Sequence, residues 1–482
     1  MPQLPDWVEK HKRKGTQVVK IGNNYYLYEI TSVWDPEKKR ARKITKKYLG
    51  KITPEGLIKP RHERLLEKFH NASVREYGAT KYLYELNSDI LERLFRYFPE
   101  YAKEIFIFSL FRLLHNSPIK NIHIYYTTSF ISEIIKDARV SPKFISKMLK
   151  DIGTEREKVK GFLKEFIIGD EFAIIDITHM FSLSENVISS VLGYNSKREF
   201  LPQIRIVFLF SLDRHMPSYF RVIPGSISDI SSLITTVKEA NVKNVVLIGD
   251  KGFYSKDNVI QLDRENIHYI FPLKRNLSLI DYSCIKSGDK RKFDGFFQFE
   301  NRIIWYYEYN VEDIDLKDKR IIVYLDEKLK IEEEKDYITR IENEEGDIEE
   351  FFNHQYKFGT IAVITDLDKT PERIYNLLKS RIEIEVMFDI FKNILHADRS
   401  YMRSDEQIDA WVFINFIALL MYYRIYRQLI ENNLLRKYSP KDVLIHLARV
   451  YKIRIDNEWL TSEVPRKTRS IIEKLNIQKH IT

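Results

Sequence analysis

Two aspartates stand in apolar segments, where an ionised carboxylate is costly. Asp176 lies inside the run FAIIDIT, and Asp250 ends the run NVVLIGD. A buried carboxylate needs a charged partner, hydrogen bonds or a metal ion, and strand ends in open α/β sheets border the ligand crevice. A helix cap or a turn would explain either aspartate alone, whereas two of them on strands of one sheet favour a shared site.

A third acid comes from segment 371–395, which begins with a proline and has an amphipathic helical pattern. At about 100° per residue, Arg381, Glu385 and Lys392 fall within about 40° of one another beside the apolar face. Glu383 falls about 160° from Glu385 and is expected to point elsewhere. The charged stripe is explained either by an ordinary i, i+4 ion pair or by a functional site.

Two aspartates and one glutamate suit two-metal phosphoryl transfer. Carboxylate oxygens are hard ligands of the kind that Mg²⁺ prefers. Two ions ~4 Å apart clamp the attacking and leaving oxygens of an in-line displacement. Arginine and lysine beside such a site hold the anionic phosphate and position the strand. The candidate acids are Asp176, Asp250 and Glu385.

The positive charge is concentrated near the amino terminus. Residues 1–70 hold 17 Lys and Arg against 8 Asp and Glu, and this surplus equals the net charge of +9 of the whole chain. Such a footprint fits an anionic polymer, most often nucleic acid, although a solvated surface also explains it. The densest basic run provides the candidate DNA contacts Lys38, Lys39, Arg40, Arg42 and Lys43.

Composition excludes several classes of protein. A chain of 482 residues that is 44% hydrophobic can fill a core, so it is neither disordered nor collagen-like. A single cysteine excludes an intramolecular disulfide or a CxxC zinc site and indicates a reducing compartment. No secretory leader is expected at Met1. Trp411–Tyr426 is shorter than the ~20 residues of a spanning helix and contains polar interruptions, so we expect a buried core helix and no membrane partner.

The order of elements indicates a mixed α/β core. Three strand-like runs after residue 170 are followed by an alternation of helix and strand, which gives the order β-β-β-α-β-α-β. Residues 61–165 are expected to be helical, and 128–137 with 141–152 is a candidate helix-turn-helix. We expect a basic β-rich domain (1–60), a helical DNA-binding or dimerisation region (61–168), a catalytic core (169–274 and 358–430), a β-rich insertion (275–357) and a C-terminal helical region (431–482).

Together these residues resemble the insertion-sequence transposases of the DDE type, the bacterial and archaeal group with a Y-x2-R-x3-E-x6-K signature. Arg381, Glu385 and Lys392 match its R, E and K at the right spacings. Leu378 stands at the tyrosine position. Either Tyr375, one turn earlier, substitutes for that tyrosine, or the contact is absent.

Other segments are similar to the same family in the same order. IIDITHMFS around Asp176 is similar to its apolar-D-x-T segment, and GDKGFYS at Asp250 matches its D-R-G-F segment with lysine in place of arginine. PGSISD resembles its P-G-N-x-S-D turn, and RSDEQIDAWVFINFIALLM resembles its closing helix. YLGKITPEG is similar to the amino-terminal region of one subgroup. The resemblance covers most of the chain.

The resemblance implies an RNase H-like mixed sheet flanked by helices, with the β insertion between the second and third acids. It implies Asp176, Asp250 and Glu385 as ligands of two Mg²⁺ ions, with Mn²⁺ as a substitute. Arg381 and Lys392 would contact transposon-end DNA. The implied activity is metal-dependent cleavage at the element's ends, followed by attack of the 3′-OH on target DNA. The implied partners are inverted repeats, target DNA and a second copy of the chain, in a cytoplasmic, nucleoid-associated location.

Two other functions are open. A transposase-derived protein that binds DNA without catalysis would keep the basic region. A carboxylate-pair hydrolase would use two acids but would leave that region and the charged stripe unexplained. Among further polar candidates, Asp229 is expected to cap a helix, Asp366 and Asp368 to lie in a loop, His179 to be a core or surface residue, and Trp305 to belong to an aromatic core.

Overall fold

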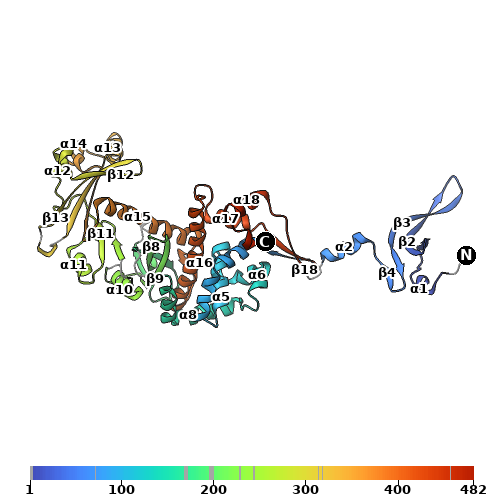
Figure 1. Ribbon diagram of the computed structural model, residues 1–482. Coiled ribbons are helices and arrows are strands. Elements are labelled where there is room, and N and C mark those ends of the chain that lie inside the picture. Colours follow the sequence, from blue (N-terminus) through green and yellow to red (C-terminus); the bar gives the residue numbers. More distant parts are fainter. Residues whose placement is uncertain are drawn as a thin grey trace. The chain divides into compact units, whose positions relative to one another are not determined.

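The computed structural model describes residues 4–70, 72–167, 172–194, 200–226, 230–242, 245–312, 314–316, 319–455 and 458–481. The chain divides into two compact units (Figure 1). The first comprises Met1–Tyr77 and Arg449–Pro465, and the second comprises Gly78–Ala448 and Arg466–Thr482.

An antiparallel meander forms the amino-terminal part of the first unit, within residues 1–60, where the sequence predicts β-structure. Its strands, in sheet order, are β1 (Thr16–Ile21), β2 (Asn24–Asp35), β3 (Arg40–Thr53) and β4 (Gly56–Ile58). Val8, from the short helix α1 (Asp6–Glu9), packs with Leu27 and Ile52 to form the core. Burial of these side chains holds the meander together.

A second sheet in this unit joins distant parts of the chain. β17 (Tyr451–Ile455) pairs with both β18 (Glu458–Thr461) and β5 (Ser73–Glu76). Helix α2 (Arg61–His70) precedes β5. Only helices were expected after residue 431, so these strands correct that expectation. The sequence YKIRI of β17 alternates apolar and basic residues, which is the strand pattern that the helical interpretation overlooked.

The second unit begins with a layer of helices. They are α3 (Gly78–Leu86), α4 (Ser88–Tyr97), α5 (Ala102–His115), α6 (Ile122–Thr128), α7 (Ile131–Ile134), α8 (Pro142–Thr154) and α9 (Arg156–Lys164), with α17 (Pro440–Leu447), α18 (Arg466–Lys474) and α19 (Gln478–Ile481) near the C-terminus. The predicted helix 128–137 is wrong, because within it only Thr128, the last residue of α6, and the four residues of α7 are helical. The hydroxyl groups of Thr127 and Thr128 bond to carbonyls of the preceding turn, and Ser129 is extended, so α6 ends here.

Helix α16 (Asp405–Glu431) forms the core of the second unit. It packs against α5, α8 and β9. Among the described residues it is the one helix long and apolar enough to cross a membrane, yet 89% of its apolar window is buried inside the protein. A helix that is apolar on all sides is buried by its neighbours. The prediction of a core helix at Trp411–Tyr426 is therefore confirmed.

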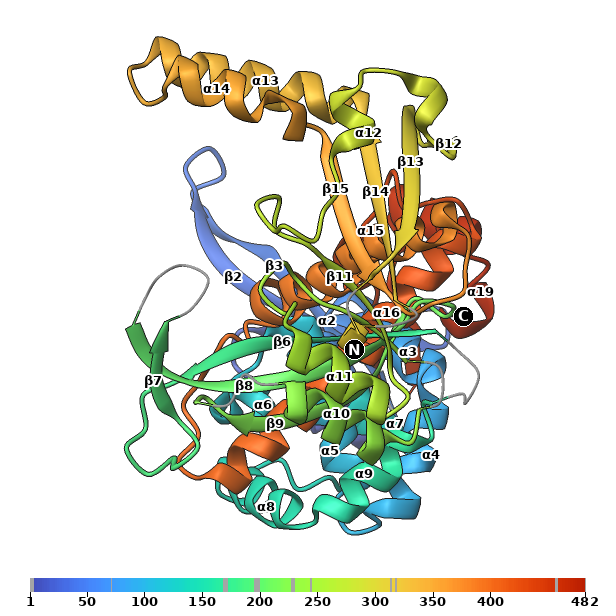
Figure 2. The same cartoon turned by 90° about the vertical axis from the view of Figure 1, so that its left-hand side faces the viewer.

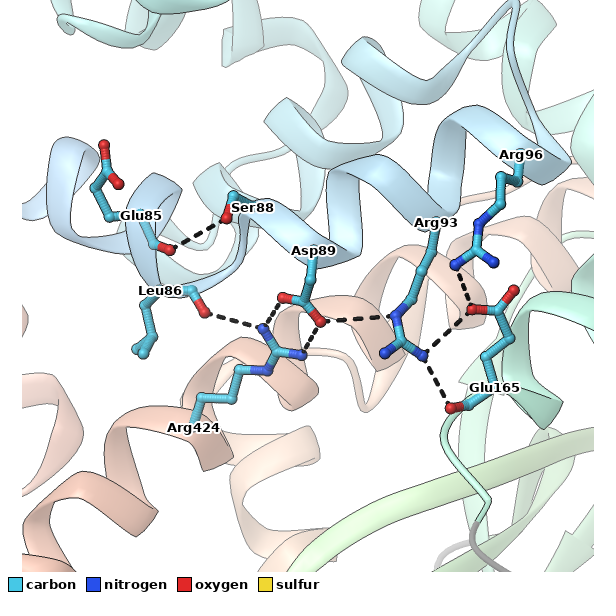
Figure 3. A network of polar contacts seen from close by, with 8 residues as sticks. All are labelled: Glu85, Leu86, Ser88, Asp89, Arg93, Arg96, Glu165 and Arg424. Atoms are coloured by element: carbon cyan, nitrogen blue, oxygen red, sulfur yellow. Dashed lines mark hydrogen bonds and ion pairs between the residues drawn. The ribbon is translucent and has the colours of Figure 1, made fainter.

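Ion pairs tie α16 to the helical layer (Figure 3). Arg424, a polar interruption of the apolar run, donates to both carboxylate oxygens of Asp89 in α4. Arg93 and Arg96 of α4 lie 3.3 and 2.7 Å from Oε2 of Glu165, which follows α9. Asp89 is the charged partner that Arg424 needs at the edge of an apolar core, and the Glu165 contacts join α4 to the end of α9.

The central sheet of the second unit has the RNase H-like strand order. β6 (Ala173–Ser182), β8 (Phe200–Ser211) and β9 (Met216–Pro224) are antiparallel neighbours, and β10 (Val245–Ile248) and β11 (His268–Pro272) continue the sheet parallel to β6. The spatial order is β9-β8-β6-β10-β11. Crossover helices α10 (Ile230–Ala240) and α11 (Lys256–Arg264) cover one face, and α15 (Pro371–Asp389) packs on the other (Figure 2). Two short strands pair at the margins, β7 (Val191–Tyr194) with β8 and β16 (Arg399–Ser400) with β6.

Residues 275–357 contain helices as well as strands. β12 (Gly295–Phe299), β13 (Arg302–Asn310) and β14 (Arg320–Asp326) extend the sheet through β15 (Thr360–Thr365) to β11, giving eleven strands. The predicted β-rich insertion is thus continuous with the core sheet. Its short helix α12 (Ser283–Lys286) precedes these strands, and its acidic stretch forms α13 (Glu327–Glu342) and α14 (Ile348–His354) at their far end (Figure 2). Glutamate and lysine favour helices, and the carboxylate of Asp326 caps α13 by accepting from Lys328 and Leu329 N–H groups, each at 3.0 Å.

Candidate active site

The three predicted acids come from two strands and a helix that pack together. Asp176 lies within β6, and Asp250 follows the end of β10 by two residues. β6 and β10 are parallel neighbours, so Asp176 lies on one strand and Asp250 lies just beyond the end of the adjoining strand. Glu385 belongs to α15, which contacts both strands. The fold therefore brings three distant sequence positions to one place.

Arg381 joins two of the three carboxylates. Its Nη2 lies 3.2 Å from Oδ2 of Asp176, and its Nη1 lies 3.3 Å from Oε1 of Glu385. A guanidinium group is a planar fork whose donors can serve two acceptors at once. Arg381 is therefore a counter-charge that Asp176 and Glu385 share, on the helix face that the sequence predicted.

Asp176 is the most buried of the three acids, with 8% of its surface exposed. Burial raises the pKa of its carboxyl group above the ordinary value, and the charge of Glu385 acts in the same direction. The charge of Arg381 and the N–H of Ile177, which donates to Oδ1 at 2.8 Å, act in the opposite direction. Ionised Asp176 therefore depends on nearby positive charge, a condition that favours binding of a cation.

Asp250 stands in a tight turn after β10. The N–H of Gly252 donates to its carboxylate, and the N–H of Phe253 donates to its carbonyl at 3.1 Å. Gly249 leaves no room for a side chain, because a Cβ there would stand 2.7 Å from Cβ of Phe253 and 2.9 Å from Cε1 of Phe271. This close packing fixes the direction in which the turn carries the exposed carboxylate of Asp250.

Lys392 lies in a short π-helical segment, Ile390–Ile394, that continues α15. The sequence predicted a single helix to about Leu395, whereas the α-helix ends at Asp389. π-helical turns occur frequently at functional sites.

Glu383 contacts His215, with 3.9 Å between Oε2 and Nδ1, and does not line the cavity that the three predicted acids share. Its predicted orientation away from Glu385 is therefore confirmed.

One cavity of about 690 Å³ collects most of the predicted site. Its lining includes all three acids and both predicted cations of the helix: Asp176, Asp250, Glu385, Arg381 and Lys392. The candidate DNA contacts of the basic run lie in the first unit instead, on β3 and in the turn before it: Lys38, Lys39, Arg40, Arg42 and Lys43.

The cavity is also lined by polar residues that the sequence interpretation did not select as site residues. They lie on β6, β8 and α11: His179, Gln203, Arg205, Asn258 and Gln261. The register places His179 directly opposite Arg205. Burial lowers the pKa of Arg205. A signal was present in the sequence, since Gln203 and Arg205 are the polar positions within the apolar run QIRIVFLF.

The other polar candidates lie elsewhere. The carboxylate of Asp366 accepts from the N–H of Tyr269 at 3.1 Å and lies 2.8 Å from Nδ1 of His268, so it joins the end of β15 to β11. Trp305 is half-buried and packs against the rings of Phe293 and Phe296, and Phe296 is 65% exposed, so Trp305 belongs to an aromatic cluster at the surface and not to a buried core as expected. Asp229 lies outside the described residues.

Tyr375 does not replace the signature tyrosine. Its side chain is fully buried, and its ring centroid lies 4.9–5.4 Å from those of Phe297, Phe299 and Tyr324. Leu378, at the signature position, is half-buried. Among the residues described around the cavity there is no tyrosine. The contact of the signature tyrosine is therefore absent from this lining.

The donor set of the cavity fits a hard divalent cation. All three acids offer carboxylate oxygens, which suit Mg²⁺ and Mn²⁺. The carboxylates of Asp176 and Glu385 already contact the same positive charge, the guanidinium group of Arg381. Within the described part of the chain, no group of three or more acidic, histidine or cysteine side chains is close enough to hold an ion as it stands. The exposed carboxylates of Asp250 and Glu385 have to turn toward Asp176 to share one.

Comparison with known families assigns the chain to a class. Residues 170–421 match the family described as "Transposase DDE domain". The match spans 252 of the 482 residues and contains every predicted residue that lines the cavity. The chain therefore belongs to the transposase DDE-domain family.

A solved structure shows a slighter likeness. It is the cryo-EM structure of a piggyBac transposase synaptic complex with hairpin DNA, at 11% sequence identity and a TM-score of 0.38. The likeness covers 72% of this chain and 70% of that chain. No curated protein matches this sequence significantly. A TM-score of this size assigns neither fold nor function, so the family match and the strand order carry the assignment.

Proposed function

We propose that the protein is a DDE transposase that cleaves DNA at the ends of a mobile element and joins the freed 3′-OH to target DNA. One observation carries the proposal: a member of the transposase family holds three carboxylates, an arginine and a lysine around a single cavity. A cavity with these groups suits an anionic phosphate that reacts with the help of divalent ions.

Each residue has a distinct role in this proposal. Asp176, Asp250 and Glu385 hold two divalent ions, Mg²⁺ or its substitute Mn²⁺. When bound, these ions activate the attacking oxygen and stabilise the leaving oxygen. Arg381 and Lys392 hold oxygens of the transposon-end phosphate through charge-assisted hydrogen bonds. Binding at the cavity therefore orients the scissile bond between the acids and the cations of α15.

The proposed partners are double-stranded DNA and a second copy of the chain. Inverted repeats at the element's ends and the target duplex are the substrates. The alternative is a transposase-derived protein that binds DNA without cutting it. The presence of all three acids at the same cavity as Arg381 favours catalysis, and the two readings differ in whether bound DNA is cleaved.

A cleavage assay tests the proposal. The full chain is incubated with duplex DNA carrying the sequences that flank its gene, with Mg²⁺ or with EDTA. We expect nicks at the element boundary with Mg²⁺ only. In the Glu385→Gln variant we expect cleavage to fall by more than the ~10–100-fold that loss of an outer-shell partner costs, because a metal ligand is lost. Gel analysis of end-labelled strands measures the rate.

Glu383→Gln is the matched control. It changes the same kind of residue on the same helix, but that residue contacts His215 outside the cavity. We expect cleavage near the wild-type rate. Equal loss in both variants would contradict the assigned role of Glu385, and DNA binding without any wild-type cleavage would favour the catalytically silent alternative.

A further inference from the structure

The outer half of the hairpin β2–β3 is a two-stranded ribbon without neighbouring strands. β1 pairs with β2 only as far as Glu29, and β4 pairs with β3 only over Lys51–Thr53. Beyond these pairs, residues 30–35 and 40–45 pair with each other, and the N–H of Ile30, at the base of the ribbon, also donates to the carbonyl of Gly15 at 2.8 Å. A two-stranded ribbon is marginally stable in water by itself. Its extension beyond the core of the meander therefore indicates a binding surface.

Exposed apolar side chains lie on this ribbon. Val33, Trp34 and Ile44 are 47%, 63% and 43% exposed. These three residues lie away from the core that Val8 and Leu27 help to form. Exposed apolar side chains on a protruding element are typical of contact surfaces.

The ribbon and its turn are strongly basic. Segment 30–47 contains seven Lys and Arg against two acids, Asp35 and Glu37. In the part of the chain that the structure describes, Lys47 is the one of these seven that forms an ion pair, with Glu63. The other six cations are available to an anionic partner. Charge of this density fits the phosphates of DNA.

The turn at the tip has a defined geometry. The N–H of Lys38 donates to Oδ1 of Asp35 at 3.1 Å. Lys39 has a φ of 47°, in the left-handed region, and closes the turn. The side chain of Asp35 thus fixes the turn, and the turn fixes the register of the strands that follow.

The register sorts the side chains into two faces. Directly paired residues share a face, and successive residues alternate between faces. The pairs Val33↔Arg42 and Asp35↔Arg40 lie on one face, together with Thr31↔Ile44, and Trp34↔Ala41 and Ser32↔Lys43 lie on the other. Two arginines and two aliphatic side chains therefore share one face of the ribbon with Thr31 and with Asp35, whose carboxylate accepts from the turn.

The dimensions of the ribbon select one groove of DNA. Six residues of strand span ~20 Å. The major groove, ~12 Å wide, admits a two-stranded ribbon without deformation, whereas the minor groove, ~6 Å wide, has to be widened to take one. Arginine recognises guanine through O6 and N7, and aliphatic side chains contact the thymine methyl group. Each of these partners is a base edge exposed in the major groove.

We infer that this ribbon enters the major groove of double-stranded DNA. Arg40 and Arg42 face the base edges, and Lys38 and Lys39 in the turn contact phosphates. The inference rests on the proposed function, in which DNA is the partner, and it deepens that function by naming the groove and the residues that read sequence.

Groove-specific ligands test the inference with the full chain. Binding to a mixed-sequence duplex is measured by fluorescence anisotropy at low salt, with methyl green as a major-groove ligand or distamycin as a minor-groove ligand. We expect methyl green to displace the protein and distamycin to leave it bound. Displacement by distamycin alone would overturn the inference.

Variants locate the contact on the ribbon. Arg40→Ala with Arg42→Ala should weaken binding about 10–100-fold. The control pair, Lys20→Ala with Lys51→Ala, removes the same charge from the meander outside the ribbon, and we expect a loss of less than about 3-fold. Circular dichroism verifies that both pairs remain folded. Equal loss in the two pairs would overturn the inference.

A conservative pair separates sequence reading from charge. Arg40→Lys with Arg42→Lys keeps both charges but loses the fork that recognises guanine. We expect binding to a mixed duplex within about 3-fold of wild type and a lower preference for G·C-containing over A·T-only duplexes. An unchanged preference would overturn the reading role. If the wild-type chain binds no duplex at low salt, the proposed function fails, whereas unaltered binding by the alanine pair would leave that function intact and remove the ribbon's role.

Discussion

At the scale of single residues, one guanidinium group controls the electrostatics of the cavity. Asp176 has lost most of its hydration, and Arg381 returns part of that stabilisation through a contact of 3.2 Å. The same group contacts Glu385 at 3.3 Å. Without Arg381, the carboxylate of Asp176 would keep the N–H of Ile177 but lose its contact with positive charge. A buried carboxylate in that state is costly.

Arg381→Ala should therefore lower the free energy of unfolding in metal-free buffer by about 1–3 kcal/mol, since a buried acceptor loses a charged donor. The same change in an Asp176→Asn background should cost clearly less, because the two residues interact directly. Urea denaturation of the four proteins measures the coupling. Additive effects would contradict the pairing of these side chains.

At the scale of elements, a buried arginine anchors the end of the helix that carries the cations. Arg112 of α5 donates to the carbonyl of Leu395 and, at 2.9 Å, to Oδ1 of Asn415. Its guanidinium carbon lies 4.5 Å from the ring centroid of Trp411. Burial lowers the pKa of Arg112 to about 10. Carbonyl and amide oxygens replace water around the guanidinium group of Arg112. Its hydrogen bond to the carbonyl of Leu395 holds the segment that follows Lys392.

Arg112→Met should lower the free energy of unfolding by about 3 kcal/mol, because the acceptors on α16 and after the π segment stay buried without a donor. Hydrogen exchange should also become faster at residues 390–397 than in α10. Arg96→Met, at a side chain that is 62% exposed, is the control and should change stability by less than about 0.5 kcal/mol. Unchanged exchange at 390–397 would contradict the anchoring role.

At the scale of the whole molecule, the described part of one chain contains one cavity that is lined by all three acids. A mobile element has two ends, and joining both to one target requires two such sites at once. A closed two-fold arrangement is the commonest way for a chain to supply a pair of sites. We therefore propose a homodimer assembled on DNA.

Mass photometry checks this expectation. With duplex that carries the element's end, the complex should contain two chains of 57.7 kDa together with the DNA. The Glu385→Gln variant should assemble in the same way, because metal ligation and DNA assembly use different contacts. A complex that cleaves both ends while it contains a single chain would contradict the dimer.

The sequence by itself determined the features that depend on local periodicity and on chemical type. The helical repeat placed Arg381 and Glu385 on one face and turned Glu383 away. The apolar pattern identified the buried helix α16, and the order of strands and helices predicted the mixed sheet. These features follow from the geometry of one element at a time, so a single segment contains the information.

Only the tertiary structure decided which distant segments meet. It placed Asp250 at the same cavity as Asp176, paired β17 with β5, reduced the predicted helix 128–137 to one turn, and buried Tyr375 away from the cavity. It also left the outer ribbon of β2–β3 without neighbouring strands. Such outcomes depend on competition among non-local contacts, and local sequence patterns carry little information about which contacts win.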